Sequence, residues 1–165
     1  MTLLQCTTDY PAPPDQANLA AMATMRSTFG VRCGYSDHTL GSAVSLAAVA
    51  LGATVIEKHF TLDRGMPGPD HKASLEPQAL REFVAEIRSV EVALGNGNKV
   101  PMPSEIPNIA VARKSLVAAK PIHKGARITA AHIAVKRPGG GASPIDYWEW
   151  IDRVADKDYL EDDPL

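Results

Sequence analysis

Three short apolar segments of the chain are each followed by polar side chains of the kinds that take part in catalysis. These clusters are Cys6–Pro11, Gly34–Thr39 and Glu57–Thr61. The second contains His38 and the third contains His59, and imidazole is a common ligand of transition-metal ions. A site with two protein ligands leaves coordination positions for water and substrate oxygens, so its ion can polarise a carbonyl group.

The histidine pair has two interpretations at this stage. If the second and third segments are neighbouring strands, about 4.8 Å apart, His38 and His59 meet at one edge of a sheet, and Glu57 projects on the same face as His59. The alternative is that each histidine is an ordinary hydrogen-bonded residue. Asp70, which follows the turn at Met66–Pro69, is equally open. It either precedes a helix or brings a carboxylate over the site.

A parallel sheet is needed to bring these clusters together. Strands are predicted at Thr2–Thr7, Val31–Ser36 and Thr54–Phe60. Helical patterns at Asp15–Phe29 and Gly41–Leu51 separate them, and this alternation is typical of βα units.

A third helix follows the last strand. Its apolar stripe runs from Leu80 to Leu94 opposite a charged face, as in an amphipathic helix at a surface. Ser74 is the expected N-cap residue, and Gly95 is expected to end the helix.

The chain becomes polar and rich in proline after this helix, which indicates a domain boundary. We predict a domain built of βα units at residues 1–95, a linker at 96–112 and a small β-rich domain at 113–165. In that unit we expect strands at Ser115–Ala119, Arg127–Ile128 and Ala134–Lys136, and a short helix at Pro144–Val154.

Composition excludes several classes of protein. A chain of 165 residues is too short for a complete eight-unit barrel, which takes about 250 residues. It is 45% hydrophobic and 22% charged, with a net charge of −2, so no basic field exists for nucleic acid. The longest apolar run, Ala43–Leu51, is far below the ~20 residues of a membrane span. We expect no signal peptide after Met1, and we expect a cytoplasmic protein that binds neither nucleic acid nor membrane.

The two cysteines, Cys6 and Cys33, lack the spacing of a disulfide framework or a cysteine-based zinc site. Cys6 is expected to be a buried strand residue rather than a nucleophile, because no basic partner is evident. His123 and His132 lie in the second half without recognisable partners, and we expect no catalytic role for them.

In order and spacing, the three polar clusters together with Gly68–His71 resemble four successive blocks of the sialic acid synthases, also called N-acetylneuraminate synthases. The stretches Arg113–Leu116 and Lys136–Gly139 resemble that family's antifreeze-like SAF module. The resemblance implies an α/β fold: the carboxyl-terminal three βα units of a TIM (β/α)8 barrel, followed by a small SAF domain of the β-clip type.

The resemblance also implies a reaction. In this family phosphoenolpyruvate condenses with an N-acetylmannosamine-type sugar, giving a nine-carbon 2-keto acid such as N-acetylneuraminate and inorganic phosphate. His38 and His59 correspond to the ligands of a divalent ion, usually manganese or magnesium, which activates the sugar aldehyde. Glu57 would handle a proton or position the sugar. Ser36 would bind phosphoenolpyruvate, as would Thr8, which stands where the family often has Asn.

Three further residues acquire roles by the same resemblance. Tyr10 and Asp70 would hold the sugar, Asp70 through the sugar hydroxyls. Arg137 corresponds to an arginine that reaches from the SAF module into the barrel of the neighbouring subunit. The resemblance therefore implies a domain-swapped homodimer.

Alternatives remain within and outside this class. The product could be legionaminic acid, pseudaminic acid or a sialic acid 9-phosphate made from a phosphorylated sugar. Outside the class, the SAF module could serve a non-catalytic carbohydrate-binding or ice-binding protein, although polar strand ends have no purpose there. The family's first five βα units and most of its phosphate-binding lysines have no counterpart in the chain. We therefore expect it to be a truncated product or one half of a split enzyme, inactive alone.

Overall fold

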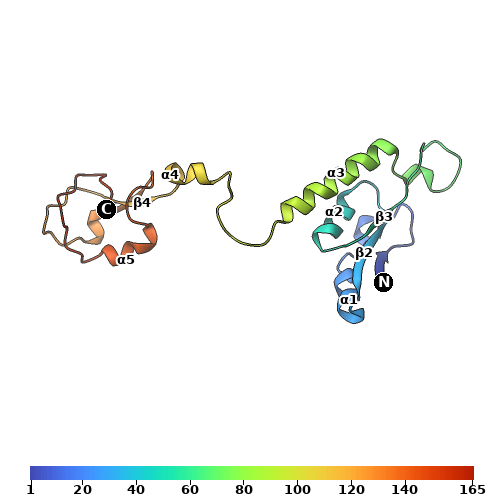
Figure 1. Cartoon of the computed structure of the whole chain (residues 1–165), viewed down its shortest axis with the longest axis horizontal. Coiled ribbons are helices and arrows are strands. Elements are labelled where there is room, and N and C mark those ends of the chain that lie inside the picture. Colours follow the sequence, from blue (N-terminus) through green and yellow to red (C-terminus); the bar gives the residue numbers. More distant parts are fainter. The chain divides into compact units, whose positions relative to one another are not determined.

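Parallel strands in sequential order form the sheet of the amino-terminal half of the chain (Figure 1). In this computed structural model, which describes all 165 residues, β1 (Thr2–Cys6), β2 (Arg32–Asp37) and β3 (Ile56–Lys58) pair in the order β1-β2-β3. The connections contain α1 (Ala21–Phe29) and α2 (Ala43–Ala50). The predicted alternation of strands and helices is confirmed, with shorter elements.

Both connecting helices cover the same face of this sheet. Met22 of α1, Tyr35 of β2 and Ala48 of α2 are buried in one hydrophobic cluster, and Leu3 and Ile56 of the flanking strands pack against it. Sequential strands with helices on one face are the arrangement of βα barrels, whereas a doubly wound sheet has helices on both faces. The opposite face of the sheet has no helix packed against it within this unit.

Helix α1 starts later than its periodicity predicts. Asp15 lies in a 3₁₀ turn (Pro14–Gln16), and α1 begins only at Ala21. Asn18, with a φ of 47°, lies between them, and this left-handed conformation interrupts a regular helix. Gly30 ends α1 with a φ of 63°, a conformation that glycine adopts without steric cost.

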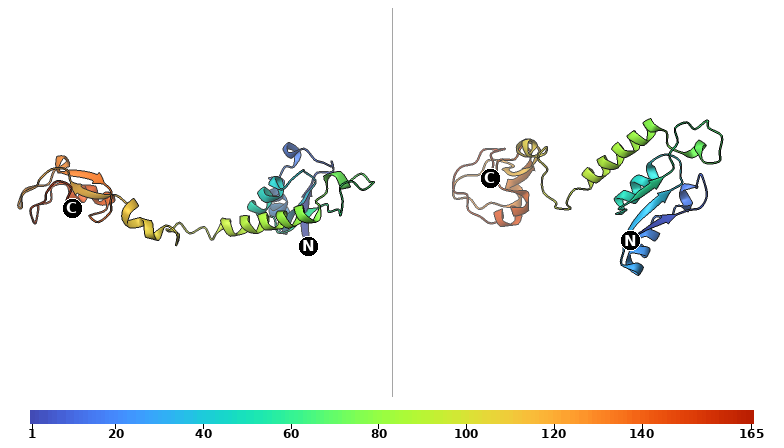
Figure 2. Two further views of the ribbon diagram at one scale, coloured as in Figure 1. Left: turned by 90° about the horizontal axis from the view of Figure 1, so that it is seen from above. Right: turned by 45° about the vertical axis from the view of Figure 1, so that its right-hand side comes forward.

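Helix α3 (Pro77–Leu94) packs against α2, and Figures 1 and 2 show the two helices side by side. Its N-cap residue is Glu76, and Pro77 occupies the first turn, where a missing N–H costs nothing. The prediction of Ser74 as the N-cap is wrong, because that hydroxyl donates instead to the carbonyl oxygen of Asp70. Gly95 follows the helix with a φ of 60°, as expected.

The carboxyl-terminal unit has its own sheet and core. Its strands β4 (Ser115–Ala118) and β5 (Ile133–Lys136) are antiparallel, and the short helix α4 (Ile109–Ala112) precedes them. The chain forms two compact units, Met1–Asn98 and Lys99–Leu165. The buried core of the second unit contains Leu116, Ala118, Ile122, Ile128, Ile133, Ala155, Tyr159 and Leu165.

Two predicted elements of this unit are different in the structure. Arg127 forms only an isolated bridge with Val154, so the strand expected at Arg127–Ile128 is absent. The expected helix at Pro144–Val154 is reduced to a 3₁₀ turn and the short α5 (Tyr147–Trp150). The backbone here bonds irregular segments to one another rather than forming a longer element.

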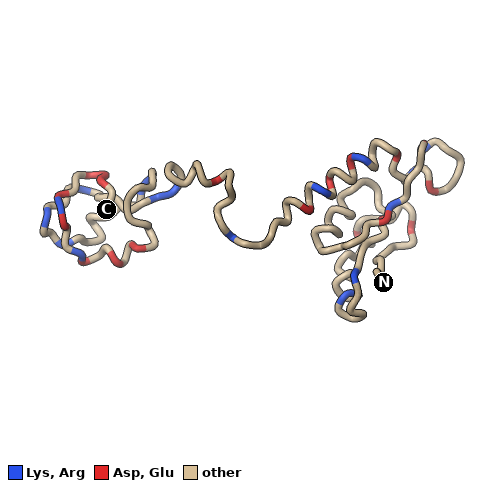
Figure 3. The backbone as a smooth tube through the Cα atoms, in the orientation of Figure 1, with Lys and Arg blue, Asp and Glu red and all other residues tan.

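Charge is distributed along the whole chain. Both units carry lysine and arginine as well as aspartate and glutamate (Figure 3). None of the helices combines the length and the apolar composition that crossing a bilayer requires.

We predict that Tyr35→Phe stabilises the amino-terminal unit. The Tyr35 hydroxyl is buried without a hydrogen-bond partner, and removing an unsatisfied buried group should gain about 1 kcal/mol. Burial raises the pKa of Tyr35 to about 12. Since the unfolded side chain ionises near pH 10, the parent should lose stability from about pH 10 to pH 12, and the variant should lose less.

Urea unfolding at pH 7 and pH 11 measures both effects. Tyr147→Phe, in the other unit, is the matched control, and it should leave the unfolding of the amino-terminal unit unchanged. A Tyr35→Phe variant that is less stable than the parent at pH 7 would contradict the assignment.

Candidate active site

The carboxyl ends of β1, β2 and β3 lie at one edge of the sheet and bring the polar clusters together. Ser36 pairs with Glu57, and Asp37 pairs with Lys58. One position further along each strand come His38 and His59, whose ring centroids are 5.1 Å apart with the planes nearly perpendicular. The histidine pair is therefore a consequence of parallel pairing in register.

Tyr10 lies over this pair from the loop that follows β1. Its ring centroid is 4.2 Å from that of His59 and 5.2 Å from that of His38. The Tyr10 hydroxyl is 3.1 Å from the Ser74 hydroxyl, and Ser74 in turn donates to the Asp70 carbonyl oxygen at 2.7 Å. Because the Ser74 proton is used there, Tyr10 donates to Ser74. Burial raises the pKa of Tyr10, which keeps this donor protonated.

A polar partner lies beside Nδ1 of each imidazole, and for His38 it is a hydrogen-bond acceptor. Nδ1 of His38 is 2.7 Å from the carbonyl oxygen of Thr7, so Nδ1 carries a proton and Nε2 keeps its lone pair. Nδ1 of His59 faces a carboxylate oxygen of Asp70 at 3.8 Å. A carbonyl or carboxylate behind a histidine is the usual outer shell of a metal ligand.

These donors are suited to a divalent ion held by few protein ligands. No group of three or more His, Cys, Asp or Glu side chains gathers in a metal-binding arrangement. An ion at His38 and His59 would therefore take its remaining ligands from water or substrate oxygens, and nitrogen ligands favour transition ions such as manganese over magnesium.

Ser36 and Glu57 form a second polar pair beside the histidines. The buried Ser36 hydroxyl donates to Glu57 Oε1 at 2.6 Å, while Glu57 itself is exposed on the face that the helices leave bare. This bond fixes one carboxylate oxygen and leaves the other free to accept a proton or a sugar hydroxyl.

Asp70 lies in a loop with several internal bonds, after β3. Its side chain is 54% exposed, so it is accessible from solvent. The Thr61 hydroxyl lies 2.7 Å from His71 Nδ1, and the Arg64 guanidinium donates to the Lys72 carbonyl oxygen. These contacts hold the loop, which favours the second interpretation of Asp70: its carboxylate lies beside His59.

Two further expected site residues are Thr8 and Arg137. Thr8 is exposed in the loop after β1 and is not among the contacts of the histidine pair. Arg137 belongs to the carboxyl-terminal unit, where it directly follows β5 and its Nε donates to the Ala112 carbonyl oxygen at 2.8 Å.

Cys6 is a strand residue, as expected, but its predicted burial is wrong. The thiol is exposed, and its Sγ lies 3.9 Å from Nδ1 and 4.0 Å from Nε2 of His38. Cys6 pairs with Ser36 across the sheet, so its side chain lies on the face that carries the histidine pair and no helix covers it.

The two histidines of the carboxyl-terminal unit have polar partners that the sequence did not indicate. The His123 ring lies 3.6 Å from Asp158. His132 likewise accepts from the Thr129 N–H.

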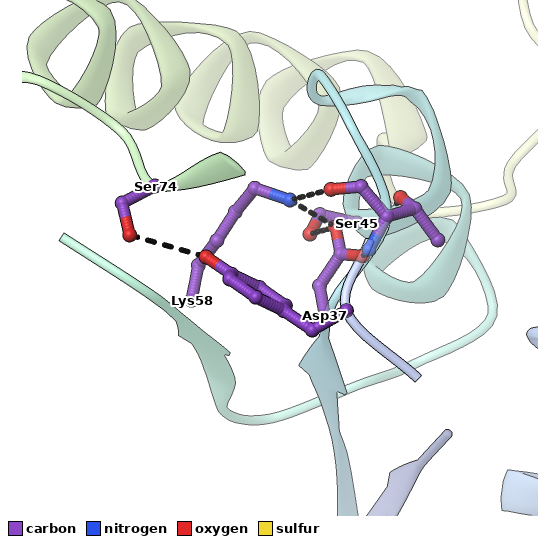
Figure 4. Close-up of polar contacts among 6 residues, drawn as sticks. Asp37, Ser45, Lys58 and Ser74 are labelled. Atoms are coloured by element: carbon purple, nitrogen blue, oxygen red, sulfur yellow. Dashed lines mark hydrogen bonds and ion pairs between the residues drawn. The ribbon is translucent and has the colours of Figure 1, made fainter. Parts of the chain in front are cut away.

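A buried network on the opposite face of the sheet was missed from the sequence. Lys58 Nζ donates to Asp37 at 2.9 Å, and their side chains are 4% and 0% exposed (Figure 4). Asp37 also accepts from the hydroxyls of Ser45 and Thr39. Burial by itself would raise the pKa of Asp37, but the bonds from Ser45, Lys58 and Thr39 together lower it. The carboxylate therefore stays ionised.

The fold and the site together define an α/β protein with polar side chains at the carboxyl edge of a parallel sheet, followed along the chain by a small β unit. The NeuB family matches residues 1–99, and the SAF domain matches residues 113–165. The chain therefore belongs to the NeuB family and carries a SAF domain. The resemblance to sialic acid synthases is confirmed.

Individual relatives agree with this family. The chain is 52% identical to the N,N'-diacetyllegionaminic acid synthase of Campylobacter jejuni over 163 residues, covering 99% of the chain and 49% of that protein. It is 40% identical to the N-acetylneuraminate-9-phosphate synthase of Homo sapiens, covering 98% of the chain and 46% of that protein. The chain thus spans about half the length of the curated relatives it matches.

A solved structure extends the agreement to the fold. The protein from Chromobacterium violaceum described as spore coat polysaccharide biosynthesis protein E superposes with a TM-score of 0.70 at 28% identity. The match covers 99% of the chain and 50% of that protein.

We predict that Lys58→Met destabilises the amino-terminal unit by roughly 3 kcal/mol, because it leaves the charge of Asp37 buried without its ion partner. The double variant Asp37→Asn/Lys58→Met should lose much less, since it removes both charges. Urea unfolding at pH 7 measures the difference.

Lys136→Met is the control for this measurement. Its ion pair with Asp162 is exposed, and such pairs contribute little to stability. A Lys58→Met variant that loses no more than Lys136→Met would show that the buried pair has no special stabilising role.

Proposed function

We propose that the chain supplies the metal-binding and sugar-binding part of a nonulosonic acid synthase, which condenses phosphoenolpyruvate with an N-acetylated amino sugar. The observation that supports this most is the meeting of Tyr10, His38 and His59, with Ser36 and Glu57 beside them, at one strand edge of a NeuB-family chain. Relatives named as an N,N'-diacetyllegionaminic acid synthase and an N-acetylneuraminate-9-phosphate synthase support this proposal.

The fold we propose for residues 1–95 is the last three βα units of a TIM barrel, with a linker at 96–112 and the SAF domain at 113–165. The sequential strand order and the helices on one face support this proposal. In such a barrel the bare face of the sheet lines the interior, and the carboxyl ends of the strands carry the active site.

We propose that His38 and His59 hold a divalent ion, manganese or magnesium. A bound ion of this kind would supply Lewis acidity toward the aldehyde oxygen of the open-chain sugar. Because the Thr7 carbonyl oxygen accepts a hydrogen bond from His38 Nδ1, Nε2 would be the nitrogen that His38 offers to an ion. The Asp70 carboxylate, 3.8 Å from His59 Nδ1, would support His59 electrostatically.

The proposed reaction forms one carbon–carbon bond. The enol carbon of phosphoenolpyruvate attacks the sugar aldehyde, whose oxygen takes up a proton and becomes a hydroxyl group. Water adds to the cationic carbon that bears the phosphate and releases a proton. The carbon–oxygen bond to phosphate then breaks, giving the nine-carbon 2-keto acid and inorganic phosphate.

The site residues have distinct roles in this scheme. Glu57, fixed through one oxygen by Ser36, would accept a proton or a sugar hydroxyl with the other. Ser36 and Thr8 would contact phosphoenolpyruvate, and Tyr10 and Asp70 would hold the sugar. The neutral hydroxyl of Tyr10 suits a hydrogen bond to an uncharged ligand.

The product is the finer part of the proposal. N-acetylmannosamine as substrate would give N-acetylneuraminate. The higher identity to an N,N'-diacetyllegionaminic acid synthase, 52% against 40% for the 9-phosphate synthase, favours a legionaminic acid as the product. A pseudaminic acid or a 9-phosphate remains a further alternative, and the cytoplasm, where phosphoenolpyruvate is available, is the proposed compartment.

We expect activity when the chain is fused to the part of the Campylobacter synthase that lies outside the match. Phosphate release from phosphoenolpyruvate should then require manganese and an acceptor sugar, and EDTA should abolish it. Comparing N-acetylmannosamine with the sugar precursor of N,N'-diacetyllegionaminic acid identifies the product class.

In this fusion His59→Ala should lower phosphate release at least about 100-fold, because an imidazole ligand of the ion is lost. His123→Ala, which changes an exposed histidine of the SAF domain, is the control and should retain parental activity. Unchanged activity of His59→Ala would overturn the metal assignment.

Arg137 provides a test of the domain-swapped homodimer. If it acts in the partner's active site, Arg137→Ala and His59→Ala fusions should each be inactive. In an equal mixture, half of the dimers contain one subunit of each variant. In such a dimer one site combines the intact His59 of one subunit with the intact Arg137 of the other, and the second site lacks both. The mixture should therefore recover about a quarter of parental activity.

Sedimentation should give the dimer mass for all these variants. A mixture that stays inactive after subunit exchange would show that Arg137 does not act across subunits.

A further inference from the structure

The last residues of β2 and β3 form a bridge between the two strands. Asp37 and Lys58 are register partners, and Lys58 Nζ lies 2.9 Å from Asp37 Oδ2. The lysine and aspartate side chains are 4% and 0% exposed. No substrate or solvent can therefore reach the bridge from the site.

This bridge fixes the backbone on both sides of His38. Asp37 precedes it, and Thr39 follows it and donates to Asp37 Oδ1 through both its backbone N–H and its hydroxyl, each at 2.8 Å. Lys58 also donates to the Thr39 carbonyl oxygen at 2.7 Å. A single ammonium group therefore holds the residue before His38 and the residue after it.

The same ammonium group belongs to the residue before His59. Successive side chains of a strand point to opposite faces, so Asp37 and Lys58 face the helices while His38 and His59 face the bare side. Ser45 of α2 donates to Asp37 Oδ2 and ties the bridge to the helical layer (Figure 4). The bridge and the histidine pair thus belong to the same two strands, with their side chains on opposite faces of the sheet.

Stability alone is a weak reason for such a bridge. Apolar residues of similar volume usually stabilise a core as well as a buried ion pair does, and the surrounding cluster of Met22, Tyr35 and Ala48 is apolar. A directional bond, unlike an apolar contact, fixes the separation and the register of two strand ends.

We propose that Asp37 and Lys58 are positioning residues that set the separation and orientation of the His38 and His59 rings. The inference rests on the proposed function in one respect, namely that the two rings hold a divalent ion. The arrangement of the rings can be measured without metal.

Nuclear magnetic resonance of the chain itself tests the proposal. The probes are nuclear Overhauser contacts from the Tyr10 ring to the His59 ring and from the His38 ring to the His59 ring, measured without metal. Manganese binding, followed by the electron paramagnetic resonance signal of free Mn²⁺, is the second measurement. The variants are Asp37→Asn, Lys58→Met and the double variant, which keeps the chain folded if a single change does not.

We expect the double variant to lose the contact between the two histidine rings and to bind Mn²⁺ about tenfold more weakly, as outer-shell changes typically do. Lys58→Arg, which keeps donors for Asp37 and Thr39, should restore both properties in part. Met22→Ala is the matched control. It destabilises the same core by a cavity but leaves the bridge intact, so it should keep both the ring contacts and the Mn²⁺ affinity.

Each outcome has a distinct meaning. If the ring contacts persist in folded Asp37→Asn and double variants, the proposal is overturned. It is also overturned if Met22→Ala loses the ring contacts, because the effect would then come from general destabilisation of the core. If the parent binds no Mn²⁺ while its ring contacts are lost only in the bridge variants, the metal assignment fails and the positioning role stands.

Discussion

Parallel pairing in register between β2 and β3 is the constraint on which the rest of the amino-terminal unit depends. The pairing of Ser36 with Glu57 and of Asp37 with Lys58 places four functional groups in two rows. Because side chains alternate along a strand, one row faces the helices and the other faces the bare side. A shift of one residue in β3 would turn its side chains to the opposite faces and would bury a histidine where the lysine now lies.

The two rows have opposite physical requirements. Asp37 is buried as a charge, so every oxygen lone pair needs a donor, and Ser45, Thr39 and Lys58 supply them. The row on the bare side needs groups with unused bonding capacity, such as Nε2 of His38 and the free oxygen of Glu57. On the helix-covered face every hydrogen-bonding position of Asp37 is used, and this network supports the residues on the bare face. Only the groups on the bare face keep free bonding positions, so only they can bind a ligand.

The sequence was sufficient for the features that follow from local rules. Alternation of strands and helices predicted the sheet, and the position of His38 and His59 after two strands predicted that the rings would lie at one edge. The bridge was also within reach of the sequence. Asp37 and Lys58 lie two positions after the buried or half-buried Tyr35 and Ile56, so a strict two-residue period assigns them to the helical face.

Features that depend on where a loop folds in space could not be predicted from residue type and spacing along the sequence. Ser74 has the residue type of an N-cap, but the loop after β3 brings it to the Tyr10 hydroxyl instead. Cys6 was predicted to be buried because strands of parallel sheets usually are, yet its burial depends on what covers the bare face. Strand periodicity gives the face of a side chain and does not say whether that face is covered.

The candidate site lies in the amino-terminal unit, which differs from the carboxyl-terminal unit in how its core is built. The carboxyl-terminal unit buries Leu116, Ile128 and Tyr159 in a core of its own. The amino-terminal unit packs helices on one face of its sheet and presents Cys6 and His59 on the other. A parallel sheet is normally covered on both faces. A bare face with histidines at its carboxyl edge is the geometry expected for the wall of a barrel interior, where site residues need rigid support behind them and open space in front.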